Sequence, residues 1–172
     1  MKILKSIFAL IMIVSLASCN NDDDNDVYLL TNANLAGTHA LTFLESEEVQ
    51  TRIFNNLPSV STISVVGDIF QVDLVLNENG SYTIEGQYRI TETTVQDGNT
   101  NIDTEIILID EGGLYTVNTS NLTLTMSFNG GESQTYDVTL FNEDELRLSY
   151  FEEGEITDGT YELTEELRMI KQ

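Results

Sequence analysis

Residues 70–90 read FQVDLVLNENGSYTIEGQYRI and carry the clearest structural signal in the chain. With one exception at Gly86, apolar side chains take every second position on both sides of an Asn/Gly-rich turn at residues 77–80. An alternation with a period of two is typical of a strand with one buried face, and a short Asn/Gly cluster between two such runs is typical of a hairpin turn. The stretch therefore predicts an antiparallel hairpin with one apolar and one polar face.

The same pattern continues to the C-terminus, with further Gly-rich turns expected at residues 96–99, 111–113 and 129–131. Counting a first strand over residues 38–45, we expect an all-β, antiparallel up-and-down meander of about eight to nine strands. A meander of this length buries its apolar face by closing into a barrel or by folding into a sandwich, and we favour the barrel. For residues 47–56 the sequence is compatible with a short helix, a strand or a lid.

Gly86 interrupts the apolar row of its strand. A glycine in that position marks a bend, as at a barrel corner, or the close approach of another part of the chain. We favour the bend.

The N-terminus has the pattern of a secretion signal. Lys2 and Lys5 precede an apolar run at residues 7–16, which is shorter than the ~20 residues that span a bilayer and has the length of a signal-peptide core. The following Leu16-Ala17-Ser18-Cys19 resembles the lipobox of bacterial lipoproteins. The resemblance implies that residues 1–18 are removed and that Cys19 is lipidated and anchored in a membrane; the alternative is an ordinary cleaved signal.

Residues 19–34 are expected to form a lipidated, acidic tether, and residues 35–172 a single β domain. Residues 20–26 read NNDDDND and lack the apolar side chains that folding requires. An acidic run directly after the lipidated cysteine resembles the surface-export signal of lipoproteins in the Bacteroidota. It implies the outer face of the outer membrane; the alternative is a spacer without an address, on the periplasmic face.

The charge of the chain excludes nucleic acid as a partner. The sequence has 7 basic and 29 acidic residues, and without Lys2 and Lys5 the expected mature chain has a net charge of −24. Binding to nucleic acid requires Lys and Arg to neutralise phosphates. Cys19 is also the only cysteine, so we expect no intramolecular disulfide and no catalytic thiol in the folded part.

Several short motifs from residue 35 onward, taken in order, resemble the lipocalin-like lipoproteins of the Bacteroidota. That resemblance implies a small calycin-type barrel with an inner cavity, and it does not imply an enzyme. It departs from lipocalins at residues 37–39, where Gly-Thr-His stands in place of Gly-x-Trp in a chain without tryptophan. His39 shares its parity with Leu41 and Phe43 and should point inward at the barrel floor, whereas Arg168 has the wrong parity for the basic residue that covers that floor. The motifs are LAGTHAL (35–41), NENGSYTI (77–84), GLYTV (113–117), NLTL (121–124) and LRL (146–148).

Catalytic and metal-binding patterns are weak. His39 is the only histidine, which is too few for a zinc cluster, and it has no recognisable partners for a catalytic triad. We therefore expect no catalytic residue, no metal and no cofactor. Glu165 interrupts an inward apolar row between Leu163 and Leu167, and it is interpreted as a rim residue, a bulge or a cavity acid, the first two being preferred.

These observations predict a non-enzymatic, membrane-anchored lipoprotein whose barrel binds a small apolar or amphiphilic ligand. The alternative is a surface module with a filled core that binds another protein or a glycan; an enzyme that uses two inward carboxylates is a third hypothesis. Tyrosines on the inner face combine an apolar ring with a hydroxyl that seeks a partner. The expected ligand-binding residues are Tyr82, Tyr88, Tyr115, Met126 and Tyr136.

Overall fold

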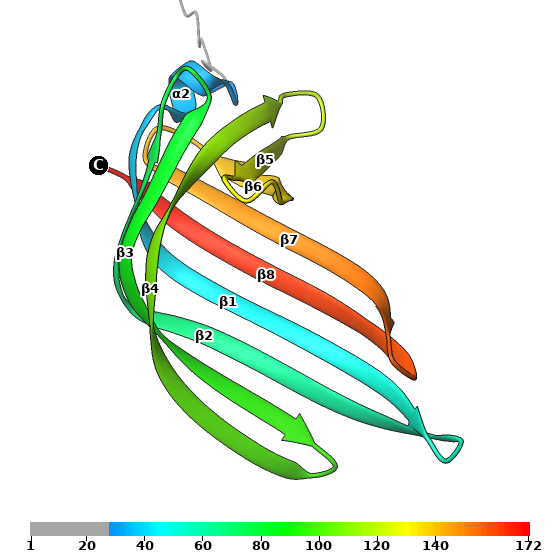
Figure 1. Ribbon diagram of the computed structural model, residues 1–172. Helices are drawn as coiled ribbons and strands as arrows, with labels where there is room; N and C mark the ends of the chain where they lie inside the picture. Colours follow the sequence, from blue (N-terminus) through cyan, green and yellow to red (C-terminus); the bar gives the residue numbers. More distant parts are fainter. Residues whose placement is uncertain (1–27) are drawn as a thin grey trace, which may run out of the picture.

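The computed structural model describes residues 28–172, and the predicted signal, lipidated Cys19 and acidic run lie outside them. These residues form a closed, antiparallel, up-and-down barrel of eight strands (Figure 1), which confirms the predicted fold class. The elements are α2 (Asn32–Leu35), β1 (Gly37–Phe54), β2 (Leu57–Leu76), β3 (Ser81–Gln96), β4 (Asn99–Asn118), β5 (Thr123–Phe128), β6 (Ser133–Phe141), β7 (Glu145–Ile156) and β8 (Gly159–Lys171).

The turn expected at residues 111–113 is not formed, and β4 runs through it without interruption. Gly113 instead pairs with Phe128 of β5. A Cβ atom at Gly113 would lie 1.9 Å from the Ser127 carbonyl oxygen, so the glycine serves a close approach of two backbones rather than a turn. This is why the strands number eight and not nine.

Residues 47–56, left open from the sequence, belong mainly to a strand. β1 continues to Phe54, and the chain reverses at Asn55 and Asn56 before β2 starts at Leu57. Both asparagines have positive φ angles, 51° and 64°, as a tight hairpin turn between twisted strands requires.

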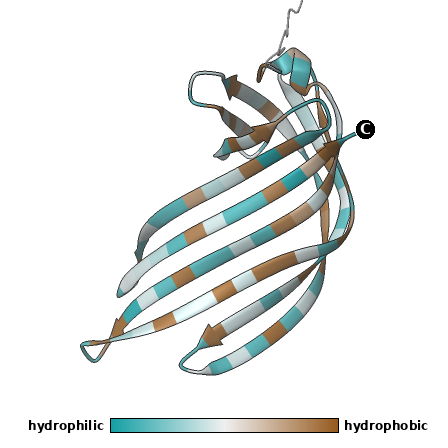
Figure 2. Cartoon of the chain, turned by 180° about the vertical axis from the view of Figure 1, so that it is seen from behind, coloured by the Kyte–Doolittle hydropathy of each residue, from teal (hydrophilic) through white to brown (hydrophobic). Residues whose placement is uncertain are grey.

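Unequal strand lengths divide the molecule into two parts. β5 and β6 have 6 and 9 residues, whereas β1 and β2 have 18 and 20. Pairing between β4 and β5 stops at Gly113, and pairing between β6 and β7 stops at Ser149. Figures 1 and 2 show the other six strands continuing past this level as a curved sheet with β4 and β7 at its edges. We call this part, residues 46–65, 88–107 and 150–165, the open extension, and the remainder the closed end.

The hydrophobic core lies in the closed end, and α2 covers its floor. Leu30 and Leu35 are buried there, and the Thr31 side chain caps α2 by accepting a hydrogen bond from the Asn34 backbone N–H. The packed domain therefore begins before Leu35, the boundary expected from the sequence. His39 is buried at this floor with Nε2 2.7 Å from the Leu35 carbonyl oxygen, in agreement with the inward position predicted for it.

A bulge in β1 reverses the side-chain parity predicted for that strand. The register with β8 shifts between Leu41 and Phe43, and one extra residue moves every later side chain to the opposite face. The expectation that Phe43 points inward was therefore wrong: Leu44 takes the inner face. Phe43 instead lies 4.2 Å below the Arg168 guanidinium.

Gly86 faces a second bulge, where the register between β2 and β3 shifts between Asp68 and Gln71. Its φ angle is 133°, and an added Cβ atom would lie 1.9 Å from the Gln71 carbonyl oxygen. Of the two interpretations of this glycine, the close approach of another backbone is the one that the structure shows. Within residues 28–172, no helix is long and apolar enough to cross a membrane.

Candidate functional site

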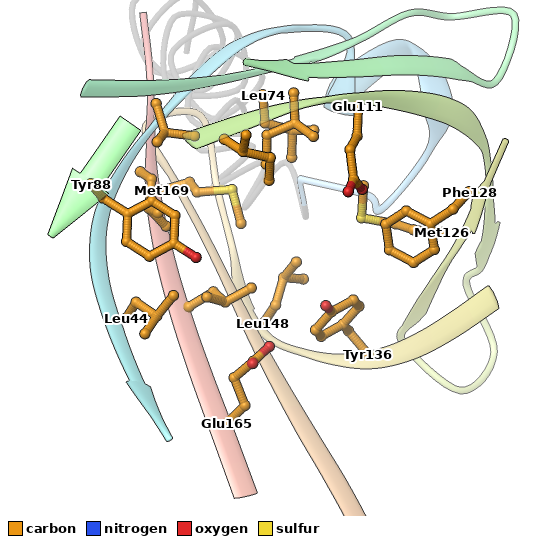
Figure 3. A pocket seen from close by; sticks show the side chains of 15 residues that line it. Leu44, Leu74, Tyr88, Glu111, Met126, Phe128, Tyr136, Leu148, Glu165 and Met169 are labelled. Atoms are coloured by element: carbon orange, nitrogen blue, oxygen red, sulfur yellow. The ribbon is translucent and has the colours of Figure 1, made fainter. Parts of the chain in front are cut away.

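A cavity of about 280 Å³ lies inside the barrel, where the closed end meets the open extension. All eight strands contribute to its wall, so it depends on the closure of the whole barrel. Eleven of the fifteen lining side chains are apolar. Figure 3 shows them surrounding an open centre. The lining residues are Leu41, Leu44, Val72, Leu74, Ile84, Tyr88, Ile109, Glu111, Met126, Phe128, Tyr136, Leu148, Glu165, Leu167 and Met169.

Three of the five predicted ligand-binding residues line this cavity: Tyr88, Met126 and Tyr136. Tyr82 and Tyr115 are also inward, but they are packed in the core of the closed end with 2% of their surface exposed and do not line the cavity. The Tyr115 hydroxyl donates a hydrogen bond to the Asn77 carbonyl oxygen at 2.7 Å. The ring of Tyr82 packs edge-on against Phe128. Alternation identifies an inward side chain, but it does not tell whether the interior at that level is filled.

Two lining residues were missed for identifiable reasons. The parity expected for His39, Leu41 and Phe43 implies the outer face for Leu44, because the bulge in β1 has no clear sequence signal. Glu111 was assigned to a turn that does not exist; in the structure it pairs with Ile84 of β3 and lies two residues from Gly113, where β5 pairing ends. The two-residue period of β4, continued through Gly112 and Gly113, would have placed Glu111 on the same face as Tyr115.

Glu165 lies on the cavity wall, and so the least favoured of its three interpretations is the one observed. It pairs with Ser46 on β1 and with Tyr150 on β7. Burial raises the pKa of its carboxyl group above the ordinary value, and the nearby Tyr136 hydroxyl acts in the opposite direction. Burial, followed by the charge of Glu165, also raises the pKa of both Tyr88 and Tyr136. Figure 3 shows Glu165 and Glu111 entering the cavity from opposite walls.

Glu152 on the inner face of the open extension has a different environment. Its carboxylate accepts hydrogen bonds from the hydroxyls of Tyr150 at 2.8 Å and Tyr161 at 2.7 Å. These two bonds, that from Tyr161 first, hold the pKa of Glu152 below its ordinary value. The pKa values of these two acids on neighbouring strands are therefore shifted in opposite directions. Hydrogen bonds stabilise Glu152 as a carboxylate, whereas burial in the cavity wall disfavours the charged form of Glu165.

The cavity wall has the chemistry of a binding site for a largely apolar molecule. Its polar side chains are Tyr88, Glu111, Tyr136 and Glu165. Among residues 28–172 there is no group of three or more His, Cys, Asp or Glu side chains arranged to hold a metal ion. Burial lowers the pKa of His39, and its ring lies in the floor rather than on the cavity wall.

Comparisons with protein-family models, with curated proteins and with solved structures find no match for this chain.

Proposed function

We propose that this chain is a membrane-anchored, non-enzymatic lipoprotein whose lipocalin-like barrel binds one small apolar or amphiphilic molecule. The cavity between the closed end and the open extension is the observation that carries this proposal. At about 280 Å³, its volume is close to the lower limit of ligand pockets, roughly 300 Å³. A filled core, which the alternative of a pure interaction module requires, would not leave this space.

The proposed anchor is Cys19, which follows the apolar run and the small residues of a lipobox. Two or three acyl chains hold a protein stably, because each buried methylene contributes ~0.8 kcal/mol. In the producing cell, Cys19→Ser should release the protein from the membrane fraction, whereas Ser18→Gly, which keeps a small residue before the cysteine, should not. Continued membrane attachment of Cys19→Ser would contradict the anchor.

The proposed address is the outer face of the outer membrane. Protease added to intact cells should degrade the protein, and replacing the acidic side chains of residues 22–24 with alanine should protect it. Digestion only after the outer membrane has been opened would place the unmodified protein on the periplasmic face.

Native mass spectrometry tests the binding function. The mature chain carrying Cys19→Ser, exported behind a signal peptide without a lipobox, should show an added mass that disappears after solvent extraction. Leu167→Trp should abolish the added mass by filling the cavity; Leu108→Trp, on a side chain that is 78% exposed, should keep it. A bare polypeptide mass, also after mixing with lipids and bile-type amphiphiles, would contradict a binding function.

One observation favours the interaction module as a second candidate. Past its last pair with β5, β4 presents an unpaired edge, and Ile102, Ile106 and Leu108 on this stretch are 63–78% exposed. Such an edge can accept an extended segment of another protein as an added strand. If this is the function, Ile106→Lys should abolish capture of the partner from the cell surface. In native mass spectrometry it should leave the presence or absence of an added ligand mass as in the parent protein.

A further inference from the structure

The charged groups of the cavity wall are all acidic. Glu165 enters from β8 and Glu111 from β4, and no Lys, Arg or His side chain is among the lining residues. The remaining polar groups are the hydroxyls of Tyr88 and Tyr136, whose pKa values are raised above the ordinary value. At neutral pH these hydroxyls stay protonated, so the wall offers carboxylates and hydroxyls only.

The basic side chains of residues 28–172 have other partners. Arg89, Arg147 and Arg168 each form an ion pair, with Asp68, Glu145 and Glu166 respectively. Lys171 donates a hydrogen bond to the Asn34 carbonyl oxygen, near the floor. Arg52 donates one to Gln50, near the end of β1 in the open extension. None of these groups lies on the wall beside Glu165, so within the described chain its carboxylate has no positive partner there.

A carboxylate in apolar surroundings is unfavourable unless an opposite charge or hydrogen-bond donors compensate it. Glu152 has such donors, and its pKa is lowered. Glu165 lies on a largely apolar wall, where burial raises its pKa more than the nearby Tyr136 hydroxyl lowers it. A ligand with a cationic head would supply the missing partner, whereas a ligand with an anionic head would add a second uncompensated charge.

The apolar side chains that make up the rest of the wall indicate that the remainder of the ligand is apolar. Side chains such as Leu74, Met126 and Met169 line the part of the cavity nearer the floor. At ~30 Å³ for each water-sized unit, a cavity of about 280 Å³ holds roughly nine such units. This is the size of a short alkyl chain with one polar head group.

We propose that the cavity selects a small cationic amphiphile, with its ammonium group beside Glu165 and its alkyl chain against the apolar wall toward the floor. The inference rests on the proposed binding function and adds the sign of the ligand's charge. Octylamine, octanol and octanoate are suitable probes, because each has eight carbons and their head groups are cationic, neutral and anionic, respectively.

Titration calorimetry of the soluble mature chain at neutral pH tests this selection. A charge-assisted hydrogen bond contributes about 1.5–3 kcal/mol, so octylamine should bind at least about tenfold more tightly than octanol, and octanoate more weakly than both. If octanol or octanoate binds as tightly as octylamine, the cavity binds ligands but the charge selection is overturned. If none of the three binds, the binding function fails, and the charge selection with it.

Glu165→Gln and Glu162→Gln form a matched pair for the same titration. Both variants remove one negative charge from β8. Glu162, however, is exposed and pairs with Val49, whereas Glu165 pairs with Ser46, so the two side chains lie on opposite faces of the strand. Glu165→Gln should weaken octylamine binding by about tenfold and leave octanol binding unchanged; Glu162→Gln should change neither. An equal loss in both variants would show that octylamine responds to the net charge of the protein and would overturn the role of Glu165. The comparison of the three probes on the unmodified protein stands even if a variant fails to fold.

Discussion

The closed end and the open extension are built from the same alternating strands but differ in what covers their inner faces. In the closed end, Leu124, Leu146 and Leu148 are at most 1% exposed. In the open extension, Phe54 and Leu57 are 70–72% exposed. Strand pairing continues through both parts; what the open extension lacks is the wall supplied by β5 and β6. Alternation of apolar and polar residues is thus enough to form a strand, but a buried core forms only where all eight strands close the barrel. The cavity lies at the level where β5 and β6 end.

The largest expected effect is on stability, through the contrast in burial. Leu124→Ala should lower the free energy of unfolding by about 3 kcal/mol, because it opens a cavity in a fully buried site. Leu57→Ala in the open extension, with a side chain that is 70% exposed, should change it by less than about 0.5 kcal/mol. Urea unfolding measures both. Equal losses would mean that the open extension has a core of its own or is covered in solution.

Gly86→Ala is expected to have the next largest effect, because it acts on the bulge where the backbones of β2 and β3 approach closely. The added methyl group would collide with the Gln71 carbonyl oxygen at a φ angle of 133°, and we expect a loss of about 2 kcal/mol or more. Gly130→Ala is the control, because nothing lies within 4 Å of its Cβ position. A neutral Gly86→Ala in urea unfolding would show that β2 and β3 separate easily at this bulge.

A pH-dependent effect is expected for Glu165. Burial raises the pKa of this carboxyl group in the folded protein. Its contribution to the free energy of unfolding is therefore complete below the pKa of the unfolded state and is lost as the pH rises through the pKa of the folded state. The groups that face it, Tyr88, Tyr136 and Tyr150, have raised pKa values and stay neutral over this range.

Glu165→Gln should therefore raise the unfolding midpoint at pH 7, with a gain that disappears below about pH 4. Glu162→Gln, which lies on an exposed position of the same strand, serves as the control and should show no such gain. Thermal unfolding followed by circular dichroism at several pH values measures the difference. A Glu165→Gln variant that is less stable than the parent at pH 7 would show that the folded protein favours the charged form.

The smallest effect is expected at Ile69, which lies in the bulge of β2 with a φ angle of 51° and 60% exposure. A β-branched side chain in this left-handed conformation costs about 1–2 kcal/mol, and asparagine tolerates it better. Ile69→Asn should therefore raise the free energy of unfolding by up to about 1 kcal/mol. Val66→Asn, at an exposed position of the same strand, should lower it slightly. The same sign for both variants would contradict the assignment of strain to Ile69.

The sequence was sufficient for the fold class but not for the exact wall of the site. Period-two alternation and Asn/Gly turns identified most of the strands, and the inward positions of Tyr88, Met126 and Tyr136 followed directly. Leu44 and Glu111 were missed because parity is counted locally, whereas a bulge or a Gly-Gly pair within a strand is resolved only by the partner strand. The lengths of β5 and β6 were predictable from the sequence. The position of the cavity beside their ends was not, because it depends on the register of all eight strands.

The methyl groups of two methionines offer the most direct test of where a ligand lies. Apart from Met1 and Met12, which belong to the expected signal, the chain contains only Met126 and Met169, and both line the cavity. Selective ¹³C-methyl labelling of methionine in the soluble mature chain should therefore give two resonances, and octylamine should shift both. Saturable binding that moves neither resonance would place the ligand outside the cavity and contradict the account.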